Sequence, residues 1–331
     1  MSFDTSKISK LGFGCMRFTG REDNTIDIEY TSKMIDAYMQ AGGNYFDTAW
    51  AYPNSEAALR KALVERYPRD SFYIADKCVA WTCCNGPEDL EKQLQESLEN
   101  LGVEYFDIYL MHNLGGIRTA KFEEYNTWDF VKSVKERGLA KHIGFSAHCT
   151  PEELEKFIAD YPEAEIVQLQ VNYLDWDSPS FRERECVEIA RAHGLPVAVM
   201  EPVKGGLLAD PSKAVKAILD EAMPNDSYAT AALRFAASVD GVYTTLSGMS
   251  TVEQVEDNMR VFADFQPLTA DEQDAIKRAQ VAMTESGIVP CTGCDYCAKV
   301  CPQGIKILDC FDRIEREITP YSRKNVLMRY N

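Results

Sequence analysis

Between residues 10 and 265, short runs of apolar and β-branched residues alternate with longer amphipathic segments. Each short run is bounded by turn residues, which is typical of strands that are buried on both faces of a parallel sheet. Eight such runs, each followed by a helical pattern, predict an α/β fold of the closed (β/α)8 TIM barrel type rather than an open sheet. The expected strands are Lys10–Gly14, Tyr45–Asp47, Phe72–Ala75, Phe106–Met111, His142–Phe145, Ile166–Gln170, Pro196–Met200 and Gly241–Thr245.

The segments between these strands carry helical patterns. Thr150 and Pro151, followed by two glutamates, are typical of an N-cap, a proline at the first helical position and an acidic first turn. One more helix is expected over residues 269–285, where Thr269 and Glu272 have the spacing of a capping box. We therefore divide the chain into a barrel, residues 1–267, and a helical extension, residues 268–331, that carries a cysteine-rich run. The other expected helices are Thr31–Ala41, Ser55–Arg66, Glu88–Leu101 and Glu152–Ala159.

The composition limits the possible partners. The 331-residue chain has a formal net charge of −17, and a surface this acidic repels phosphate backbones, which argues against nucleic acid as a partner. No apolar run reaches the roughly 18 residues that a membrane helix requires. The N-terminal segment lacks the apolar core of a secretory signal. We therefore expect a cytoplasmic protein without a membrane partner, and the sequence leaves its oligomeric state open.

Four polar side chains lie at or just after the carboxyl ends of neighbouring predicted strands, where barrel enzymes place their active sites. Asp47 ends the second strand and Tyr52 follows it in the loop, while Lys77 and His112 follow the third and fourth strands. These residue types suit the reduction of a carbonyl group, in which hydride delivery leaves an alkoxide that must receive a proton.

A tyrosine can donate that proton, although an isolated phenol has a pKa of about 10. A neighbouring lysine ammonium favours the phenolate, and such a charge typically lowers a pKa by roughly 1–3 pH units. An aspartate holds the lysine charged and in place, and a histidine orients the carbonyl oxygen. Asp47, Tyr52, Lys77 and His112 are therefore the candidate catalytic residues.

Three segments carry a family resemblance. NYFDTAWAYPNSE, YIADK and DIYLMHN resemble the catalytic segments of the aldo-keto reductase family, in that family's order and spacing. The resemblance covers roughly residues 8–265 and implies an NAD(P)H-dependent enzyme that reduces an aldehyde or a ketone. It also implies that Tyr52 is the general acid/base and that Asp47, Lys77 and His112 support it. One departure is Arg60, where family members often carry glycine.

The cofactor site does not follow the dinucleotide-binding fingerprint, because Arg17 occupies the place of the third glycine in GFGCMR. The family resemblance implies instead that the cofactor lies extended across the top of the barrel. It implies that Gly205 lets the backbone approach the pyrophosphate, with Lys204 as a charge partner, while a plain turn is the alternative for this glycine. The implied contacts are Met16, Arg17, Ser146, Gln168, Met200, Pro202, Lys204, Gly205, Ser247, Gly248, Ser250, Gln254 and Asn258.

The chain departs from the family pattern within this site. Ser146 and Gln168 resemble the family's contacts to the nicotinamide carboxamide, but Ala147 replaces an asparagine beside Ser146. Met200 stands where many relatives place an aromatic residue against the nicotinamide ring. The resemblance puts residues 246–259 at the adenosine end, and no basic residue occurs there to hold a 2′-phosphate. The choice between NADPH and NADH therefore stays open.

Four of the eleven cysteines fall in one C-x2-C-x2-C-x3-C-P run near the C-terminus. This spacing matches the bacterial ferredoxin pattern of iron–sulfur ligands. In a reducing compartment it predicts a [4Fe-4S] cluster rather than disulfides, with zinc as the main alternative. A subgroup of aldo-keto reductases is similar to the chain here, with a cysteine-rich C-terminal tail. The predicted ligands are Cys291, Cys294, Cys297 and Cys301.

The fourth cluster ligand is open, because the last cysteine of such a run serves a second cluster in two-cluster ferredoxins. Either Cys301 closes the site or a remote thiol does so, from Cys310, Cys83 or Cys84. The cysteine run also supports a second functional hypothesis. In it, a nicotinamide-binding barrel works as a redox sensor, or it passes electrons through the cluster to a redox partner protein.

Overall fold

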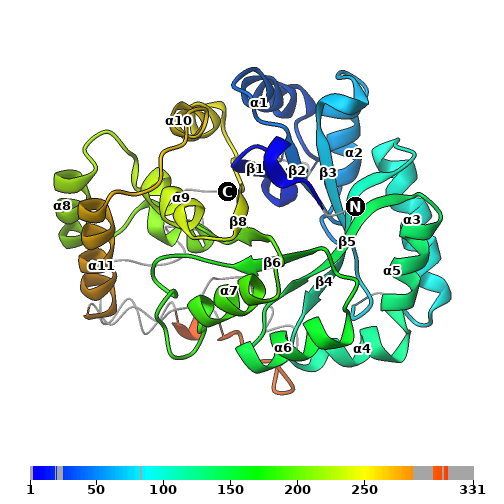
Figure 1. Ribbon diagram of the computed structural model, residues 1–331. Coiled ribbons are helices and arrows are strands. Elements are labelled where there is room, and N and C mark those ends of the chain that lie inside the picture. The colour runs from blue at the N-terminus through cyan, green and yellow to red at the C-terminus, as the bar shows by residue number, and fades with distance from the viewer. Residues whose placement is uncertain are drawn as a thin grey trace.

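The structure is a computed structural model that describes residues 3–18, 20, 25–82, 84–285, 301–307 and 309–311. It confirms the predicted barrel: eight parallel strands pair in chain order, and β8 pairs with β1 to close the sheet. Figure 1 shows the strands at the centre with the helices around them. The strands are β1 Leu11–Gly14, β2 Tyr45–Asp47, β3 Tyr73–Cys78, β4 Phe106–Leu114, β5 Ala140–Ala147, β6 Ile166–Gln170, β7 Val197–Met200 and β8 Val242–Ser247.

The helices follow the strands in alternation. The predicted start of the sixth helix is confirmed, since Thr150 and Glu153 form a reciprocal capping box and Pro151 is the first helical residue. The predicted helix Ser55–Arg66 differs, because its second half, Arg60–Val64, is a π-helical turn. The helices are α1 Ile28–Gln40, α2 Ser55–Leu59, α3 Glu88–Leu101, α4 Thr119–Glu124, α5 Thr127–Glu136, α6 Pro151–Asp160, α7 Glu183–Ala192, α8 Lys213–Ala222, α9 Tyr228–Ser238, α10 Val252–Phe262 and α11 Ala270–Glu285.

Strands β3, β4 and β5 extend farther toward their carboxyl ends than the sequence predicts. Lys77, His112 and Ser146 therefore lie within strands rather than after them. The predicted strands end at the first polar residue after an apolar run. Backbone pairing with the neighbouring strand continues past that residue. The pairing of β4 with β5 also contains an irregularity between Met111 and Leu114.

Side chains two residues apart on a strand point into the barrel in successive layers, and here an apolar layer lies below a polar one. On β4, Leu110 belongs to the apolar layer, and His112 lies two residues farther on. On β6, Ile166 and Gln168 have the same relation. The apolar layer closes the barrel below the polar side chains, so the interior is accessible only at the carboxyl ends of the strands. The layer consists of Ile8, Tyr45, Ala75, Ile108, Leu110, Ile166, Ala198, Tyr243 and Leu246.

A second apolar layer lies between the strands and the helices, and it fixes the orientation of each helix. In α3, Leu90, Leu94 and Leu101 are buried at helical spacing, while most of the glutamates of the helix face outward. Burial of each such leucine contributes about 1.5–3 kcal/mol. The helix ends at Gly102, whose φ of 68° suits a glycine.

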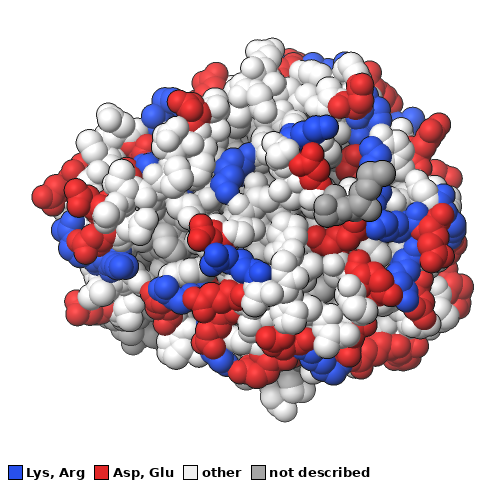
Figure 2. Space-filling model, viewed as in Figure 1, with Lys and Arg blue, Asp and Glu red and all other residues white. Residues whose placement is uncertain are grey.

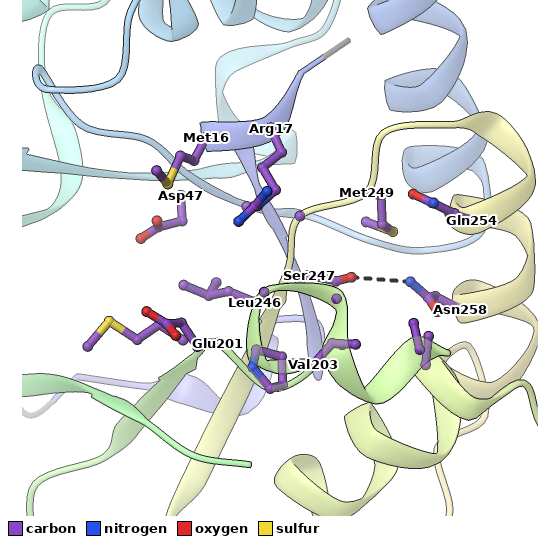
Figure 3. Close-up of a pocket in the computed structure, with 18 of the residues that line it drawn as sticks. Met16, Arg17, Asp47, Glu201, Val203, Leu246, Ser247, Met249, Gln254 and Asn258 are labelled. Atoms are coloured by element: carbon purple, nitrogen blue, oxygen red, sulfur yellow. Dashed lines mark hydrogen bonds between the residues drawn. The ribbon is translucent and has the colours of Figure 1, made fainter. Parts of the chain in front are cut away.

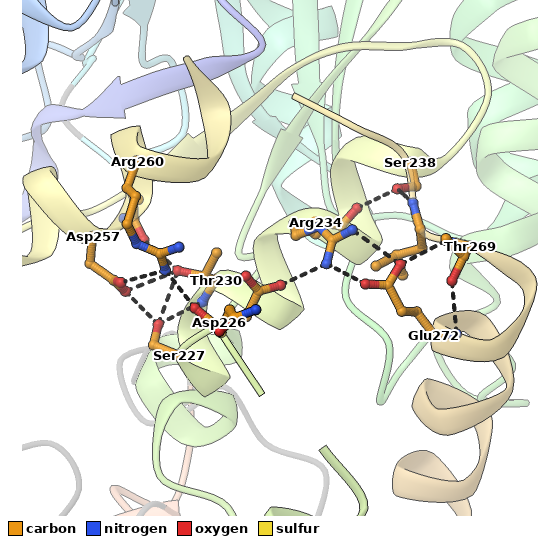
Figure 4. Close-up of polar contacts among 12 residues, drawn as sticks. Asp226, Ser227, Thr230, Arg234, Ser238, Asp257, Arg260, Thr269 and Glu272 are labelled. Carbon is orange, nitrogen blue, oxygen red and sulfur yellow. Dashed lines mark hydrogen bonds and ion pairs between the residues drawn. The ribbon is translucent and has the colours of Figure 1, made fainter. Parts of the chain in front are cut away.

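One arginine fastens the first helix of the extension to the outer layer of the barrel. Arg234 of α9 donates to Asp226 at 2.6 Å and to Glu272 of α11 at 2.7 and 3.1 Å. Figure 4 shows Arg234 between these two carboxylates. Glu272 also completes the predicted capping box with Thr269, and α11 packs against α8. The helix expected over residues 269–285 is therefore confirmed, whereas the domain boundary after residue 267 stays a prediction.

Charges are mixed on the face of the molecule in Figure 2, where acidic and basic side chains are interspersed around the rim and the centre is largely uncharged. No helix in the described part of the chain is long and apolar enough to cross a membrane.

The predicted iron–sulfur site falls largely outside the described residues. Of its candidate ligands, Cys301 is partly buried and Cys310 is exposed, and Cys84 accepts a hydrogen bond from Gln93 at 3.1 Å. Within the described ranges, no group of three or more His, Cys, Asp and Glu side chains could hold a metal ion. The cluster and its fourth ligand therefore stay predictions. The candidate ligands outside the described residues are Cys83, Cys291, Cys294 and Cys297.

Replacing Arg234 with methionine is expected to lower the free energy of unfolding by about 3 kcal/mol, because two largely buried carboxylates lose their cation. The side chains of Arg234, Asp226 and Glu272 are only 10%, 9% and 16% exposed. Urea denaturation measures this loss. Lys33→Met is the control, since it removes an exposed ion pair with Glu29 and is expected to cost much less. Equal losses in the two variants would contradict the anchoring role of Arg234.

Candidate active site

A cavity of about 520 Å³ opens at the carboxyl ends of the strands, the face at which barrel enzymes carry their active sites. Figure 3 shows Met16 and Arg17 on one side of it and Glu201 and Val203 on the other. The predicted residues that line the cavity are Met16, Arg17, Asp47, Tyr52, His112, Ser146, Gln168, Met200, Pro202, Gly205, Ser247, Gly248, Gln254 and Asn258.

A buried ion pair supports one wall of the cavity. Lys77 of β3 donates from Nζ to Asp47 Oδ1 at 2.6 Å and to the backbone oxygen of Thr48 at 2.7 Å. The Lys77 side chain has no exposed surface, and that of Asp47 is 4% exposed. Burial raises the pKa of Asp47, and the charge and hydrogen bond of Lys77 oppose this rise, as does a hydrogen bond from Gln168. Because β2 and β3 are hydrogen-bonded neighbours, the sheet itself holds the two charges together.

Tyr52 lies beside this ion pair, in a tight turn between β2 and α2. The turn is closed by hydrogen bonds from Tyr52 N to Ala49 O at 2.9 Å and from Ser55 N to Tyr52 O at 3.1 Å. The Nζ atom of Lys77 is 5.1 Å from the centre of the Tyr52 ring. The His112 ring meets the Tyr52 ring edge-on, with 5.6 Å between the two centroids. The structure thus brings together all four predicted catalytic side chains.

His112 presents a neutral imidazole to the cavity. Burial lowers its pKa well below the usual value, and the charges of Lys77, His148 and Arg118 lower it further. Its Nδ1 is buried and has no hydrogen-bond partner among the described residues. A neutral imidazole donates one N–H, so His112 can orient a carbonyl oxygen without adding a second positive charge beside Lys77.

Ser146 and Gln168 lie side by side near the ends of β5 and β6, where the strand register pairs them. Gln168 Oε1 is buried, and nothing in the described structure donates a hydrogen bond to it. Ser146 Oγ accepts a hydrogen bond from the backbone N–H of Asn113 at 2.8 Å, so its hydroxyl still has a proton to donate. Together the two side chains offer an acceptor and a donor, which suits a carboxamide.

Lys204 does not face the cavity, contrary to the prediction. Its side chain is fully buried, with Nζ in contact with the Asp175 carboxylate and 4.8 Å from the centre of the Phe181 ring. Burial of an ammonium is costly without an opposite charge, so Lys204 is committed to Asp175 and is not available to a pyrophosphate. Gly205 and Gly206 do line the cavity, and their φ angles of 63° and 99° favour glycine.

The other end of the cavity is formed by β8 and α10. Asn258 Nδ2 donates to Ser247 Oγ at 3.3 Å, as Figure 3 shows. A Cβ atom on Gly248 would lie 3.2 Å from Cδ of Arg17, so the glycine leaves room for the arginine. The predicted contact Ser250 is not part of the lining, and its Oγ instead donates to the backbone oxygen of Arg17 at 3.0 Å.

Glu201 is a cavity residue that the sequence analysis missed. It follows β7 directly, with a left-handed φ of 55°, and its Oε2 is buried without a hydrogen-bond partner in the described ranges. Burial raises its pKa to about 7. Lys204 and Arg17 oppose this rise, and the charge of Asp175 adds to it. Its position immediately after a predicted strand, the signal that singled out His112, would have found it.

Asn113, Glu253 and Asp257 also line the cavity and were not foreseen. The two acids are four residues apart on α10, so helical spacing places them on the face that carries Gln254 and Asn258. Asn113 adjoins His112 and lies in the irregular part of β4, which no pattern in the sequence marks.

Comparison with known proteins identifies the family of the barrel. The model of the Aldo/keto reductase family matches residues 10–280. An aldo-keto reductase of Mycolicibacterium smegmatis is 28% identical over 269 residues, which cover 78% of this chain and 88% of the relative. The NADH-specific methylglyoxal reductase of Escherichia coli is 26% identical, with 61% of this chain and 65% of the relative covered.

A solved structure has the same fold. The holo form of an aldo-keto reductase from Bacillus halodurans superposes with a TM-score of 0.66 at 26% identity, covering 82% of this chain and 92% of that one. The matched segment contains every strand of the barrel and every residue that lines the cavity. The chain therefore belongs to the aldo/keto reductase family and is an NAD(P)H-dependent oxidoreductase.

Proposed function

We propose that this protein reduces an aldehyde or a ketone to the alcohol, with Tyr52 as the proton donor. The observation that carries the proposal is the buried Lys77 ammonium 5.1 Å from the Tyr52 ring, with the neutral imidazole of His112 beside it. A bound nicotinamide cofactor supplies the hydride to the carbonyl carbon. His112 orients the carbonyl oxygen, and Tyr52 transfers its phenolic proton to that oxygen.

The ion pair makes this proton transfer favourable. Once Tyr52 has given up its proton, the Lys77 ammonium stabilises the phenolate, and the ion pair with Asp47 holds the lysine in place. The phenolate regains a proton from solvent through the open side of the cavity. Over the whole reaction the carbonyl gains one hydride and one proton, so Tyr52 ends in the state in which it began.

The cavity residues fit a nicotinamide cofactor. The unpaired Gln168 Oε1 and the Ser146 hydroxyl suit its carboxamide, and Met200 lines the cavity next to them, where a thioether can pack against the nicotinamide ring. Gly205 exposes backbone at the cavity wall, where a diphosphate can approach it, and Arg17 supplies a positive charge for the phosphates.

The charges at the α10 end favour NADH over NADPH. Glu253 and Asp257 line this end, and Arg17 is the one lysine or arginine among the described lining residues. A 2′-phosphate beside two carboxylates would meet repulsion rather than a charged partner. The Escherichia coli relative is named as NADH-specific.

For the C-terminal extension we propose a [4Fe-4S] cluster bound by the cysteine run. Its support is the ligand spacing from Cys291 to Cys301, followed by Pro302. The same spacing favours a second candidate function, in which the cluster senses redox state or exchanges electrons with a partner protein. Turnover separates the two proposals, because a sensor needs cofactor binding but no carbonyl reduction.

Tyr52→Phe is expected to lower kcat by about 10³-fold, because the phenylalanine cannot give a proton to the alkoxide, while cofactor affinity is retained. Oxidation of NADH and NADPH with methylglyoxal as the test carbonyl measures turnover, and fluorescence titration measures binding. Tyr228→Phe is the matched control, since Tyr228 also lines the cavity but its hydroxyl bonds to Asp220. If wild type and Tyr52→Phe both bind cofactor and are equally inert, the reductase proposal is wrong.

Cofactor affinity is expected to fall as the pH rises through about 7. The Glu201 carboxyl has its pKa raised to about 7, so it is neutral below that pH and negatively charged above it. The anionic form repels the cofactor diphosphate, so Kd is expected to increase by about tenfold between pH 6 and pH 8.5. Fluorescence titrations of the protein with cofactor between pH 6 and pH 8.5 measure this change in Kd. Glu201→Gln should bind with a Kd that is nearly independent of pH, whereas Glu253→Gln should keep the wild-type profile.

Protein purified without oxygen is expected to contain about four iron and four sulfide per chain, with absorption near 400 nm. Cys294→Ser should lose this iron, since one ligand of the cluster is removed. Cys186→Ala should keep it, because Cys186 lies on α7 and bonds to the backbone oxygen of Cys149. Stoichiometric zinc in place of iron would show that the cysteine run holds a different metal.

A further inference from the structure

Asn113 lines the cavity at a bulge in the barrel wall. Met111 pairs with Phe145, and Leu114 pairs with Ala147, so β4 has one residue more than β5 over this stretch. Asn113 takes up the extra residue with a left-handed φ of 68°. Such a bulge changes the direction of a side chain, and asparagine tolerates the left-handed conformation better than most residues.

The backbone of Asn113 is fully hydrogen-bonded, whereas its side-chain amide is not. The N–H donates to Ser146 Oγ at 2.8 Å, and the carbonyl oxygen accepts from Arg118 Nε at 2.8 Å. The residue is only 2% exposed. Both Oδ1 and Nδ2 are buried, and neither has a hydrogen-bond partner within the described structure. A buried amide of this kind costs free energy without a ligand, so the side chain suits a ligand that offers both a donor and an acceptor.

The surroundings of Asn113 identify that ligand. It lines the cavity next to His112 in the chain, and its N–H bonds to Ser146, one of the two side chains that we propose hold the nicotinamide carboxamide. Ala147 has no polar side chain to contribute there. We infer that Asn113 binds the carboxamide of the nicotinamide, with Nδ2 donating to the carboxamide oxygen and Oδ1 accepting from its N–H. The inference rests on the proposed function.

The hydrogen-bonding groups of the carboxamide match in number those that the protein offers. A primary carboxamide has two N–H donors and an oxygen with two lone pairs. Gln168 Oε1 and Asn113 Oδ1 each accept one N–H, while the Ser146 hydroxyl and Asn113 Nδ2 each donate to the oxygen. All four sites of the carboxamide are then satisfied, and the unpaired atoms of Gln168 and Asn113 gain partners.

The test compares NAD+ with its acetylpyridine analogue, in which a methyl ketone replaces the carboxamide and no N–H remains. Dissociation constants are measured on the full-length protein by quenching of its fluorescence. Wild type is expected to bind NAD+ about tenfold more tightly than the analogue. Asn113→Gly suits the left-handed backbone and removes the amide. This variant should raise the dissociation constant of NAD+ by about tenfold and that of the analogue by about threefold. The reason is that NAD+ loses two hydrogen bonds and the analogue loses one.

Asn126→Gly is the matched control. Asn126 is also left-handed, with a φ of 49°, but it is exposed and bonds to Asp129 at 2.7 Å on α5. Its variant should keep both wild-type dissociation constants. Asn113→Asp serves as a second variant if the glycine variant does not fold. It keeps an acceptor and loses the donor, so it should bind both ligands more weakly and still prefer NAD+.

The possible outcomes separate this inference from the proposed function. One contrary result is that Asn113→Gly binds both ligands as wild type does, and another is that its binding of both weakens by the same factor. In either case the proposed hydrogen bonds between Asn113 and the carboxamide are wrong, and the reductase proposal stands. If Asn113→Gly instead raises only the KM for the carbonyl substrate, Asn113 contacts substrate and the inference is overturned. If wild type binds no NAD+, both proposals fail.

Discussion

The active-site end of the cavity depends on one buried ion pair, between Asp47 on β2 and Lys77 on β3. An ammonium with no exposed surface is costly to bury without an opposite charge, and Asp47 supplies one at 2.6 Å. The turn that carries Tyr52 begins immediately after Asp47, and Thr48 holds the lysine through its backbone oxygen. One interaction therefore fixes the position of the charge on which proton transfer relies.

The other cavity residues reach the site because a closed parallel barrel has only one accessible interior end. Every strand points its carboxyl end the same way, and the apolar layer beneath fills the interior. Polar side chains that would be unfavourable inside a packed core are tolerated one layer above it, where they meet a cavity. His112 on β4 and Gln168 on β6 are examples, each two residues past an apolar partner on its own strand.

Much of the fold and part of the site could be predicted, because both follow from local patterns. The alternation of short apolar runs with helical patterns predicts the barrel, and polar residues at or after the strand ends are the four candidate catalytic side chains. What could not be predicted depends on contacts between distant segments or on an irregular backbone. The sequence predicts Lys204 as a partner for phosphate, but Asp175, 29 residues away, binds its ammonium. Asn113 lies at a bulge that depends on how β4 pairs with β5.

Several buried polar atoms around the cavity lack hydrogen-bond partners among the described residues, and this lowers the stability of the unliganded protein. His112 Nδ1, Gln168 Oε1, Glu201 Oε2 and both amide atoms of Asn113 are buried without partners in the described structure. A buried polar atom without a partner costs free energy. The closed sheet and its apolar layers must offset this cost in the unliganded state. These atoms lie around one cavity. A ligand that forms hydrogen bonds with them removes this cost, and the free energy released contributes to its affinity.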